Sequence, residues 1–382
     1  MLKLVKNEKG HRIGNLRTKN GVINTPFFMP IATKGTVRTL CSKEVEQIGF
    51  EAVLGNTYHL WLKPGDDLIK SAGGLHTFMN WKKSILTDSG GYQVFSLGAK
   101  VKKRSGQSKV KITEDGVNFS DPKNGKKYFM SPEDSIKIQL NLDSDIIMCL
   151  DECPPYPCSY EDVKKSLALT TRWAERCKKY FNKLLKENNI SDKRRPLLFG
   201  IVQGSNYKDL REESAHQLID IGFDGYAIGG VAVGEPREEM KKILRWVIPI
   251  LPKNKPRYLM GLGRPEELVL AVKLGVDMFD CVIPTREGRH GRLFTWKKNP
   301  KEINIFKTKE DNFYETININ NQKFKKDFSK VSDFCDCELC KNYSKAYLRH
   351  LFTVKESLGG KLATLHNLNF YWKLLEKMGR VD

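Results

Sequence analysis

The chain has 382 residues, enough for one large domain or two ordinary ones, and 40% of them are apolar, so a packed core is feasible. Lysine and arginine number 65 against 45 aspartate and glutamate, and the net charge of +20 favours a polyanionic partner such as nucleic acid, with solubilising lysines as the alternative. No apolar stretch is long enough to cross a bilayer, and the N-terminal MLKLVKNEKG lacks the apolar core of a signal peptide, so we expect no membrane association.

Short apolar runs recur along the chain, with amphipathic stretches between most of them. The runs predicted as strands are Ile23–Ile31, Phe50–Leu54, Ile85–Thr87, Ile146–Leu150, Leu197–Val202, Gly225–Ile228, Tyr258–Met260 and Val276–Ile283. The predicted helices are Ser131–Leu142, Tyr160–Leu185, Asn206–Ile221, Pro236–Ile250 and Pro265–Leu274. Strands that alternate with helices predict a parallel sheet, and about eight of them favour a closed (β/α)8 barrel over an open doubly wound sheet.

Two segments depart from this alternation. After Tyr92, residues Lys100–Tyr128 are polar and basic, with Asp115-Gly116 and Asn124-Gly125 as turn signals. They predict an antiparallel insertion at about 98–130, either a lid over the barrel mouth or an inert hairpin. The second segment, Lys297–Lys330, is rich in lysine and asparagine and is predicted to be an irregular insertion of unknown role.

Polar residues or glycines follow several predicted strands. Asp88, Asp151 and Gln203 follow three of them, and Gly229-Gly230 and Gly261 follow two more. Asp280 lies inside the last run, before Pro284 and a predicted basic loop with Arg286, Arg289, His290 and Arg292. One such residue can be a turn cap, but acids and amides from four strands predict an active site at the C-terminal mouth of the barrel.

The residue types at this mouth indicate a chemistry. Asp88 and Asp280 suit the nucleophile and the general acid/base of retaining glycoside chemistry. Asp151 with Gln203 suits the edge of a nucleobase, because a carboxylate accepts from ring N–H and amino groups and an amide serves a carbonyl oxygen. Gly229-Gly230 lets backbone N–H groups approach a ligand closely, and Tyr92 can stack on a base. Glycosidic-bond chemistry on a nucleobase is therefore the prediction.

Nine cysteines, an odd number without a secretion signal, predict reduced thiols in the cytoplasm. Three of them form the pattern C-x-C-x2-C at Cys335, Cys337 and Cys340, which suits one structural zinc ion; three unligated thiols are the alternative. The fourth ligand is either His350, in the predicted helix Ser344–Phe352, or His366, at the start of a later element, and spacing alone does not choose.

These residues lie in motifs that closely resemble the tRNA-guanine transglycosylase (queuine tRNA-ribosyltransferase) family of bacterial type. The resemblance covers about residues 10 to 380. Its motifs are TDSGGYQVFSL (87–97), LDECPPYP (150–157), GIVQGS (200–205), YAIGGVAVGE (226–235), YLMGLGRPEE (258–267), MFDCVIPTREGRHG (278–291) and CDCELC (335–340).

The resemblance implies an irregular (β/α)8 barrel over residues 1–296, with the antiparallel insertion, followed at 297–382 by a zinc-binding subdomain whose C-terminal helix packs on the barrel. It implies a cytoplasmic homodimeric pentosyltransferase that exchanges guanine 34 in GUN-anticodon tRNAs (Asp, Asn, His, Tyr) for preQ1, 7-aminomethyl-7-deazaguanine. The exchange would proceed by double displacement through a covalent enzyme–RNA intermediate. A structural Zn2+ ion is implied in each subunit, and no redox or nucleotide cofactor.

The resemblance also assigns residues. Asp280 matches the nucleophile and Asp88 the proton acceptor and donor. The substrate-binding set is Ser89, Gly90, Gly91, Tyr92, Asp151, Cys153, Gln203, Gly229, Gly230, Val231, Val233 and Met260. The RNA-binding set is Gly261, Leu262, Gly263, Arg264, Pro265, Glu266, Glu267, Thr285, Arg286, Glu287, Gly288 and Arg289. The zinc ligands are Cys335, Cys337, Cys340 and His366, which selects His366 over His350.

Two departures and one specificity position follow from the same resemblance. Val231 stands where bacterial relatives usually have leucine, and the Lys297–Lys330 insertion is longer than usual. Val233 stands where queuine-using eukaryotic relatives have glycine, so a branched side chain fills the room that the cyclopentenediol of queuine needs and preQ1 is the expected base.

Three other functions were weighed. A non-catalytic tRNA-binding subunit would lack the acids, but Asp88 and Asp280 are both present. The archaeal relative, which modifies another tRNA position, has further C-terminal RNA-binding domains, whereas this chain ends sixteen residues after His366. A barrel glycosidase acting on sugars fits neither the zinc motif nor the basic charge.

Overall fold

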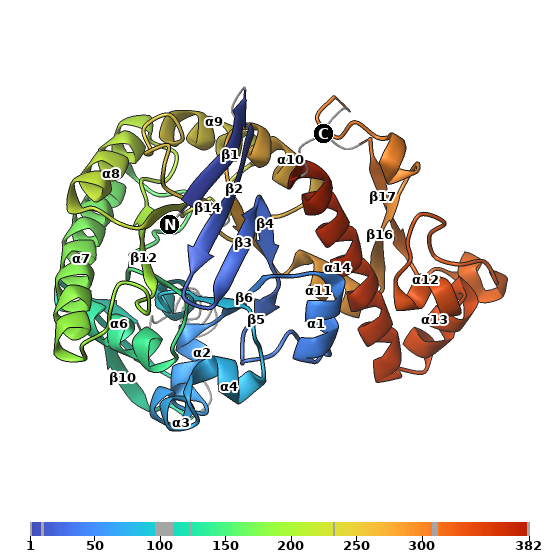
Figure 1. The fold of residues 1–382 in the computed structure, drawn as a ribbon, viewed down its shortest axis with the longest axis horizontal. Coiled ribbons are helices and arrows are strands. Elements are labelled where there is room, and N and C mark those ends of the chain that lie inside the picture. Colours follow the sequence, from blue (N-terminus) through green and yellow to red (C-terminus); the bar gives the residue numbers. More distant parts are fainter. Residues whose placement is uncertain are drawn as a thin grey trace.

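A parallel β-sheet curled into a barrel forms the centre of the molecule (Figure 1). The computed structural model describes residues 2–8, 11–95, 110–121, 124–231, 234–307 and 312–379. The barrel strands, in spatial order, are β4 (Phe27–Met29), β15 (Met278–Asp280), β14 (Arg257–Leu259), β13 (Gly225–Ile228), β12 (Leu197–Val202), β11 (Ile146–Met148), β7 (Ser84–Thr87), β6 (Ala52–Gly55) and β5 (Ile31–Ala32). All their pairings are parallel, which confirms the predicted α/β barrel.

The barrel closes at a strand that Pro30 interrupts. β4 pairs with β15 on one side and β5 pairs with β6 on the other, and only Pro30 separates β4 from β5. The Pro30 carbonyl accepts from Leu54 N at 3.0 Å, so the break still joins the neighbouring strand. Because β4 and β5 occupy one strand position, the nine assigned strands fill the eight positions of a (β/α)8 barrel.

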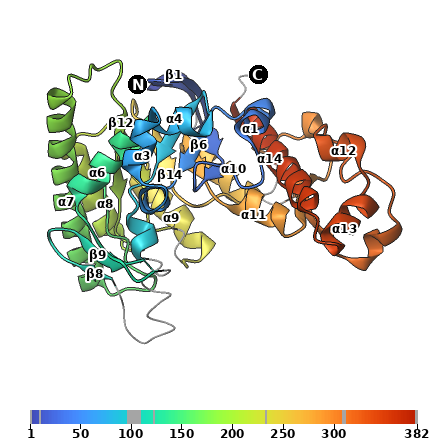
Figure 2. The same ribbon diagram turned by 90° about the horizontal axis from the view of Figure 1, so that it is seen from below.

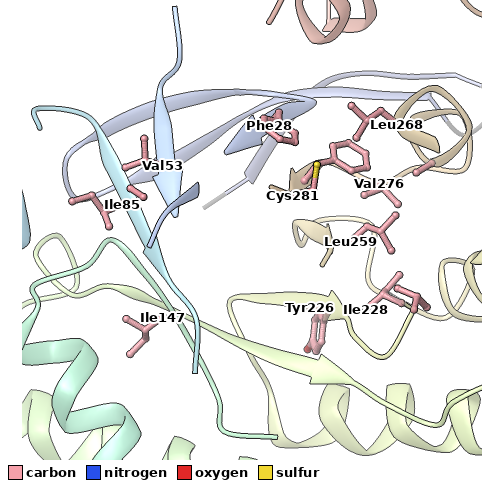
Figure 3. Packing of buried hydrophobic residues seen from close by; sticks show 14 of the residues in the cluster. Phe28, Val53, Ile85, Ile147, Tyr226, Ile228, Leu259, Leu268, Val276 and Cys281 are labelled. Carbon is pink, nitrogen blue, oxygen red and sulfur yellow. The ribbon is translucent and has the colours of Figure 1, made fainter. Parts of the chain in front are cut away.

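Alternation along the strands divides the core into an inner and an outer layer. On β11, Ile146 and Met148 point inward, and Ile147 points outward beneath the surrounding helices. Figure 3 shows this outer layer, to which strands around the barrel contribute Val53, Ile85, Ile147, Tyr226, Ile228 and Leu259. With apolar side chains on both faces, these strands have the continuous hydrophobic sequences typical of buried parallel sheets.

Helices surround the barrel, and their ends agree with the predictions to within three residues. The five that were predicted around the barrel are α6 (Pro132–Asn141), α7 (Tyr160–Glu187), α8 (Lys208–Ile221), α9 (Arg237–Val247) and α10 (Pro265–Lys273). Shorter helices are α1 (Ser42–Ile48), α2 (Thr57–Leu62), α3 (Asp66–Ser71) and α4 (Gly74–Met79). Among the described residues, no helix is both long and apolar enough to cross a membrane.

A three-stranded antiparallel sheet covers the N-terminal end of the barrel. Its strands are β1 (Leu2–Glu8), β2 (His11–Thr18) and β3 (Gly21–Thr25). Leu2, Leu16 and Ile23 from this sheet join the inner layer of the barrel core, and buried Arg12 donates to Asp277 Oδ1 at 3.0 Å. One end of the barrel is therefore sealed, which leaves the C-terminal end of the strands for a ligand.

The predicted insertion forms a second antiparallel sheet, of strands β8 (Lys111–Ile112), β9 (Val117–Ser120) and β10 (Lys127–Met130). Figure 2 shows it at the end of the barrel opposite to β1. Phe119 stacks on Tyr128 with centroids 5.6 Å apart and packs on Trp61 of α2, so the described part is anchored to the barrel. Residues 98–109 and 122–123 of the insertion lie outside the described residues, and its role as a lid stays a prediction.

The C-terminal part forms a separate lobe beside the barrel (Figure 2). Its elements are β16 (Arg292–Trp296), η1 (Pro300–Glu302), β17 (Tyr314–Asn318), η2 (Gln322–Lys326), α12 (Glu338–Asn342), α13 (Lys345–Thr353) and α14 (Ser357–Gly379). The lobe has its own apolar cluster, which includes Leu293, Leu339 and Leu348, and α14 packs against α11 (Ile283–Arg289) of the barrel. We propose the predicted division near residue 297, although β16 and β17 from its two sides pair in one sheet.

Five local predictions were wrong. Only Met278–Asp280 of the run Val276–Ile283 is a strand, and the predicted basic loop is largely helix α11, because Pro284 is tolerated in a first helical turn. The run Ile23–Ile31 is divided among β3, β4 and β5. The segment Lys297–Lys330 is not irregular throughout, since β17 pairs with β16, and His366 lies within α14 rather than at the start of an element.

Candidate active site

Asp88 follows β7 at the C-terminal end of the barrel and is 9% exposed. Its Oδ1 accepts from Thr57 N at 2.9 Å, and its Oδ2 accepts from the side-chain amides of Asn56 and Gln93. Burial, opposed by the Thr57 N–H and reinforced by the charge of Asp280, raises the pKa of Asp88 to about 7. Asp88 can therefore either hold or release a proton near neutral pH.

Asp280 ends β15, at the same end of the barrel as Asp88, and is also 9% exposed. Its Oδ1 accepts from the Tyr258 hydroxyl at 2.6 Å and from Gly261 N at 2.8 Å. Burial raises the pKa of Asp280, and these two hydrogen bonds oppose that rise. No described residue donates to Oδ2, so one carboxylate oxygen is held in place and the other is available to a substrate.

Asp151 and Gln203 face each other across the ends of β11 and β12. Gln203 Nε2 donates to Asp151 Oδ2 at 2.7 Å, and Ser89 Oγ donates to Oδ1 at 3.3 Å. Burial raises the pKa of Asp151 to about 6, so this carboxyl is mostly ionised at neutral pH. The buried Gln203 Oε1 has no hydrogen-bond partner among the described residues, which leaves polar capacity for a ligand.

Two glycines follow β13 beside Gln203. A Cβ at Gly229 would lie 2.8 Å from Gln203 Nε2, and one at Gly230 would lie 2.5 Å from Gln203 Oε1. Gly230 also has a φ of +58°, which disfavours a side chain. The backbone at both positions therefore approaches Gln203 more closely than any other residue would allow.

Other predicted base-site residues lie around this group. A Cβ at Gly91 would lie 3.0 Å from the Asp151 carbonyl oxygen, so only glycine fits there easily, and the Tyr92 side chain is half-exposed. Burial raises the pKa of the Cys153 thiol to about 12, so it is a neutral wall residue. Val231 is buried and Met260 is partly buried, whereas Val233 lies outside the described residues.

The two predicted RNA segments follow β14 and β15, and their residues differ in exposure. Arg264 precedes α10 and is exposed, as is Arg286 on α11. Glu266 and Glu267 are buried and hold Arg237 at 2.7 and 3.3 Å, so their carboxylates are engaged within the protein. The remaining predicted positions, half of them buried, are Gly261, Leu262, Gly263, Pro265, Thr285, Glu287, Gly288 and Arg289.

The four predicted metal ligands meet in the C-terminal lobe. The Sγ atoms of Cys335, Cys337 and Cys340 and a ring nitrogen of His366 all lie within 4.8 Å of one another. His366 Nδ1 is 3.5 and 3.3 Å from the sulfurs of Cys337 and Cys340, and its Nε2 lies 2.8 Å from the Phe294 carbonyl. An Nε2–H that donates to this carbonyl leaves Nδ1 free to coordinate, so the donor set fits one tetrahedral ion.

Four neighbours of the acids were missed by sequence reasoning: Asn56, Thr57, Gln93 and Tyr258. Asn56 and Thr57 follow β6, so the rule that located Asp88 would have found them. Gln93 lies in the same motif as Asp88. Tyr258 stands at the start of an apolar run and looks like a core residue, and no sequence signal separates it from one.

The arrangement combines two functions at one end of the barrel. Asp88 can exchange a proton near pH 7, while Asp280 presents an oriented carboxylate oxygen, and together they suit displacement at a glycosidic carbon. Asp151, Gln203 and the backbone at Gly229-Gly230 form a polar cluster, and its groups suit a flat heterocycle with adjacent donors and an acceptor.

Comparison with known proteins adds an independent observation. The family model described as "Queuine tRNA-ribosyltransferase" matches residues 7–380. Proteins of that name are similar over almost the whole chain. The one from Vibrio atlanticus is 49% identical over 372 residues, 97% of this chain and 89% of the relative. Those from Shewanella halifaxensis and Halothermothrix orenii are each 48% identical, over 96% of this chain and 88% and 89% of the relative.

Proposed function

The chain belongs to the queuine tRNA-ribosyltransferase family of tRNA-modifying transferases, and we propose that it exchanges guanine 34 in GUN-anticodon tRNAs for preQ1 by double displacement. The tRNAs would be those for Asp, Asn, His and Tyr. The observation that carries this proposal is the pair of buried acids at the ends of β7 and β15: the charge of Asp280 raises the pKa of Asp88, and the two differ in their hydrogen bonding.

In the proposed first displacement, Asp280 Oδ2 attacks the ribose C1′ of nucleotide 34. The bond from C1′ to guanine N9 breaks as the bond to Asp280 forms, and protonated Asp88 supplies the proton that guanine takes as it leaves. Tyr258 and Gly261 hold Oδ1 and so orient Oδ2. The product of this step is a ribosyl ester of Asp280.

In the second displacement, preQ1 enters and Asp88 takes the proton from its N9 as N9 attacks C1′. Asp280 leaves as a carboxylate, and Asp88 is again protonated. Two inversions at C1′ retain the configuration, and water is not consumed. A group that alternates between acid and base works best with a pKa near the working pH, and the pKa of Asp88 is raised to about 7.

The guanine edge is matched by the polar cluster beside these acids. We propose that Asp151 accepts from N1–H and the 2-amino group, and that Gln203 and the Gly230 N–H donate to O6, while Tyr92 stacks on the ring. Gln203 Nε2 donates one of its two hydrogens to Asp151, so the other can serve O6 when a base binds. The same edge is present in guanine and in preQ1, so one site serves both displacements.

We propose Zn2+ as the ion held by Cys335, Cys337, Cys340 and His366, one per subunit. Four protein ligands complete a tetrahedral shell, so the ion would fix the fold of the lobe and supply no open position for chemistry. The ligands connect residues near α12 to α14, the helix of the lobe that packs against α11 of the barrel.

The partner proposals rest on charge and on cysteine state. The net charge of +20 and the exposed Arg264 and Arg286 near Asp280 support tRNA as the partner. All nine cysteines are free, which supports the cytoplasm as the location. A homodimer is proposed from the family resemblance, and its mass in solution is the test.

The decisive experiment incubates the protein with GUN-anticodon tRNA and radiolabelled guanine. Incorporation of label into nucleotide 34 supports transglycosylation, whereas release of guanine without incorporation indicates a hydrolase, and binding alone indicates an accessory subunit. With the same tRNA, preQ1 should displace guanine far more efficiently than queuine, and Val233→Gly should narrow that difference because glycine opens room for the larger base. Equal use of both bases by the unaltered protein would contradict the preQ1 assignment.

A further inference from the structure

Arg211 is a fully buried arginine behind the proposed base site, and the base-exchange mechanism does not use it. It lies in the first turn of α8, at 0% exposure. Its Nη1 donates to the carbonyls of Val202 and Gly229 at 3.0 and 2.7 Å. Its Nη2 donates to the Gly230 carbonyl at 2.8 Å, and its Nε to the Ser205 carbonyl at 2.7 Å. One guanidinium thus ties together the loops that follow β12 and β13.

This cation is buried without a directly paired acid. No carboxylate among the described residues lies within ion-pair distance of Arg211, and burial lowers its pKa to about 10. Cys153 and Glu235 favour the charged form electrostatically, but neither pairs with Arg211 directly and burial outweighs them, so a neutral apolar side chain would serve ordinary packing better. A planar guanidinium can donate to four carbonyls at once, whereas an ammonium cannot.

The carbonyls that Arg211 holds determine where the neighbouring N–H groups point. In a trans peptide, the C=O and the following N–H point in opposite directions. Holding the Gly229 carbonyl toward Arg211 therefore turns the Gly230 N–H away from it, and this N–H has no acceptor among the described residues. Gly230 has a φ of +58°, a conformation that a glycine leaves easily unless it is held.

We propose that Arg211 is a positioning residue for base specificity, which fixes the Gly230 N–H as a hydrogen-bond donor to the 6-oxo group of the base. The proposal deepens the proposed function and rests on it for the identity of the base. Under this proposal the base site has two sides. Asp151 binds the N1–H and 2-amino groups of the base, and Arg211 affects only the side that binds O6.

The test compares guanine with two analogues, each of which is altered on one side of the base. Guanine carries both features, 6-thioguanine keeps N1–H and the 2-amino group but has a weakly accepting sulfur at position 6, and hypoxanthine lacks only the 2-amino group. Their dissociation constants are measured by calorimetry without tRNA, so the result does not depend on transfer. The variant is Arg211→Lys, which keeps the charge but cannot hold four carbonyls.

In Arg211→Lys, guanine should bind roughly tenfold more weakly or worse, as expected for a misplaced donor. Binding of 6-thioguanine should weaken much less, so the preference for guanine over 6-thioguanine narrows. The preference for guanine over hypoxanthine should stay the same, because Asp151 is untouched. A purely structural role would leave both preferences unchanged or degrade both together.

Arg257 provides the matched control. It too is buried, donates to the carbonyls of Gly275 and Leu251, and has its pKa lowered to about 10, but it stands at the opposite end of the barrel. Arg257→Lys should lower the melting temperature and leave both base preferences as in the unaltered protein.

An Arg211→Lys protein that keeps its full preference for guanine over 6-thioguanine overturns the proposal. Failure of the unaltered protein to incorporate guanine into tRNA, with base binding intact, overturns the proposed function alone. If Arg211→Lys does not fold, a crystal structure of the unaltered protein with guanine decides. O6 within hydrogen-bond distance of Gly230 N, with the Arg211 bonds in place, supports the proposal, and a Gly230 N–H turned away from the base overturns it.

Discussion

The Tyr258 hydroxyl donates to Asp280 Oδ1 across 2.6 Å, and both residues are buried on adjacent barrel strands. Gly261 N donates to the same oxygen at 2.8 Å. Two donors on one oxygen fix the rotation of the carboxylate and oppose the rise in pKa that burial causes. The second oxygen accepts no hydrogen bond from a described residue, which suits the proposed role of Asp280 as the nucleophile.

Replacing Tyr258 with phenylalanine removes one of these donors without changing the packing much. The pKa of Asp280 should rise further, so adduct formation should need a higher pH, and its rate at neutral pH should fall about tenfold. Single-turnover rates across pH measure both effects. Tyr226→Phe, on the neighbouring strand β13 but outward-facing, is the control and should leave the profile unchanged. If Tyr258→Phe loses adduct formation at the same low pH as the unaltered protein, the hydrogen bond does not affect the pKa of Asp280.

Asp280→Asn should abolish base exchange while tRNA binding persists, because the amide cannot form the ribosyl ester. The measurement is a denaturing gel for the protein–RNA adduct, which the unaltered protein should give and the variant should not. Asp277→Asn is the matched control, three residues earlier at the sealed end of the barrel, where Asp277 pairs with Arg12. It should lower thermal stability and keep the adduct. An adduct in Asp280→Asn would mean that another residue is the nucleophile.

The two half-reactions should respond to pH in opposite directions through Asp88. Its pKa is raised to about 7, so the protonated form that the departing guanine needs disappears as the pH rises through 7. Adduct formation should therefore slow above about pH 7. Attack of preQ1 on the isolated adduct needs the carboxylate and should speed up over the same range. Asp88→Ala should lose turnover, and the pH dependence of both adduct formation and preQ1 attack should disappear. Parallel pH profiles for the two steps would contradict this assignment.

The sequence was sufficient for the architecture and for the acids, because both obey local rules. Apolar runs separated by helical stretches predict a parallel barrel, and polar residues at strand ends predict its active-site end, as Asp88 and Asp151 illustrate. The helix predicted from Ser131 is α6, which begins with a capping box in which Ser131 and Asp134 bond each other's backbone.

Other features depend on contacts between distant residues and leave no local pattern. Tyr258 serves Asp280 only because β14 and β15 pair side by side, and Arg211 reaches two loops that only the barrel brings together. The helix α11 was predicted as a loop because Pro284 ends strands in general, and only the structure places it in a first helical turn. Spacing alone could not choose between His350 and His366; the family resemblance selected His366, and the fold brings it to the three cysteines.

Loss of the metal should unfold the C-terminal lobe before it affects the chemistry. The lobe's apolar cluster is small, and three of its members, Leu339, Leu348 and Leu351, lie close in sequence to the cysteines. Cys340→Ser, or treatment with a strong chelator, should therefore lower the melting temperature and weaken tRNA binding or dimerisation. Cys41→Ser, at an exposed thiol outside the cluster, is the control. Purified protein should contain about one zinc per chain, and full activity with less than half an equivalent would contradict a structural zinc.

Binding of tRNA should weaken steeply with salt, because each phosphate that a lysine or arginine neutralises releases a counterion. Each such contact adds about 0.7 to 0.9 to the slope of log affinity against log salt, depending on the strand state. Arg286 is exposed on α11, directly after Asp280. Arg286→Ala should lower the affinity and reduce the slope by about one contact.

Arg194→Ala is the matched control, which tests whether the effect of Arg286→Ala depends on its position at the barrel mouth. Arg194 is also exposed, but it lies before β12 at the sealed end of the barrel, so Arg194→Ala removes the same charge from the opposite end. If the charge acts locally, the slope should fall for Arg286→Ala and stay constant for Arg194→Ala. Equal effects of the two variants would mean that only net charge matters. A slope near zero in the unaltered protein would mean that the +20 charge serves solubility rather than phosphate binding.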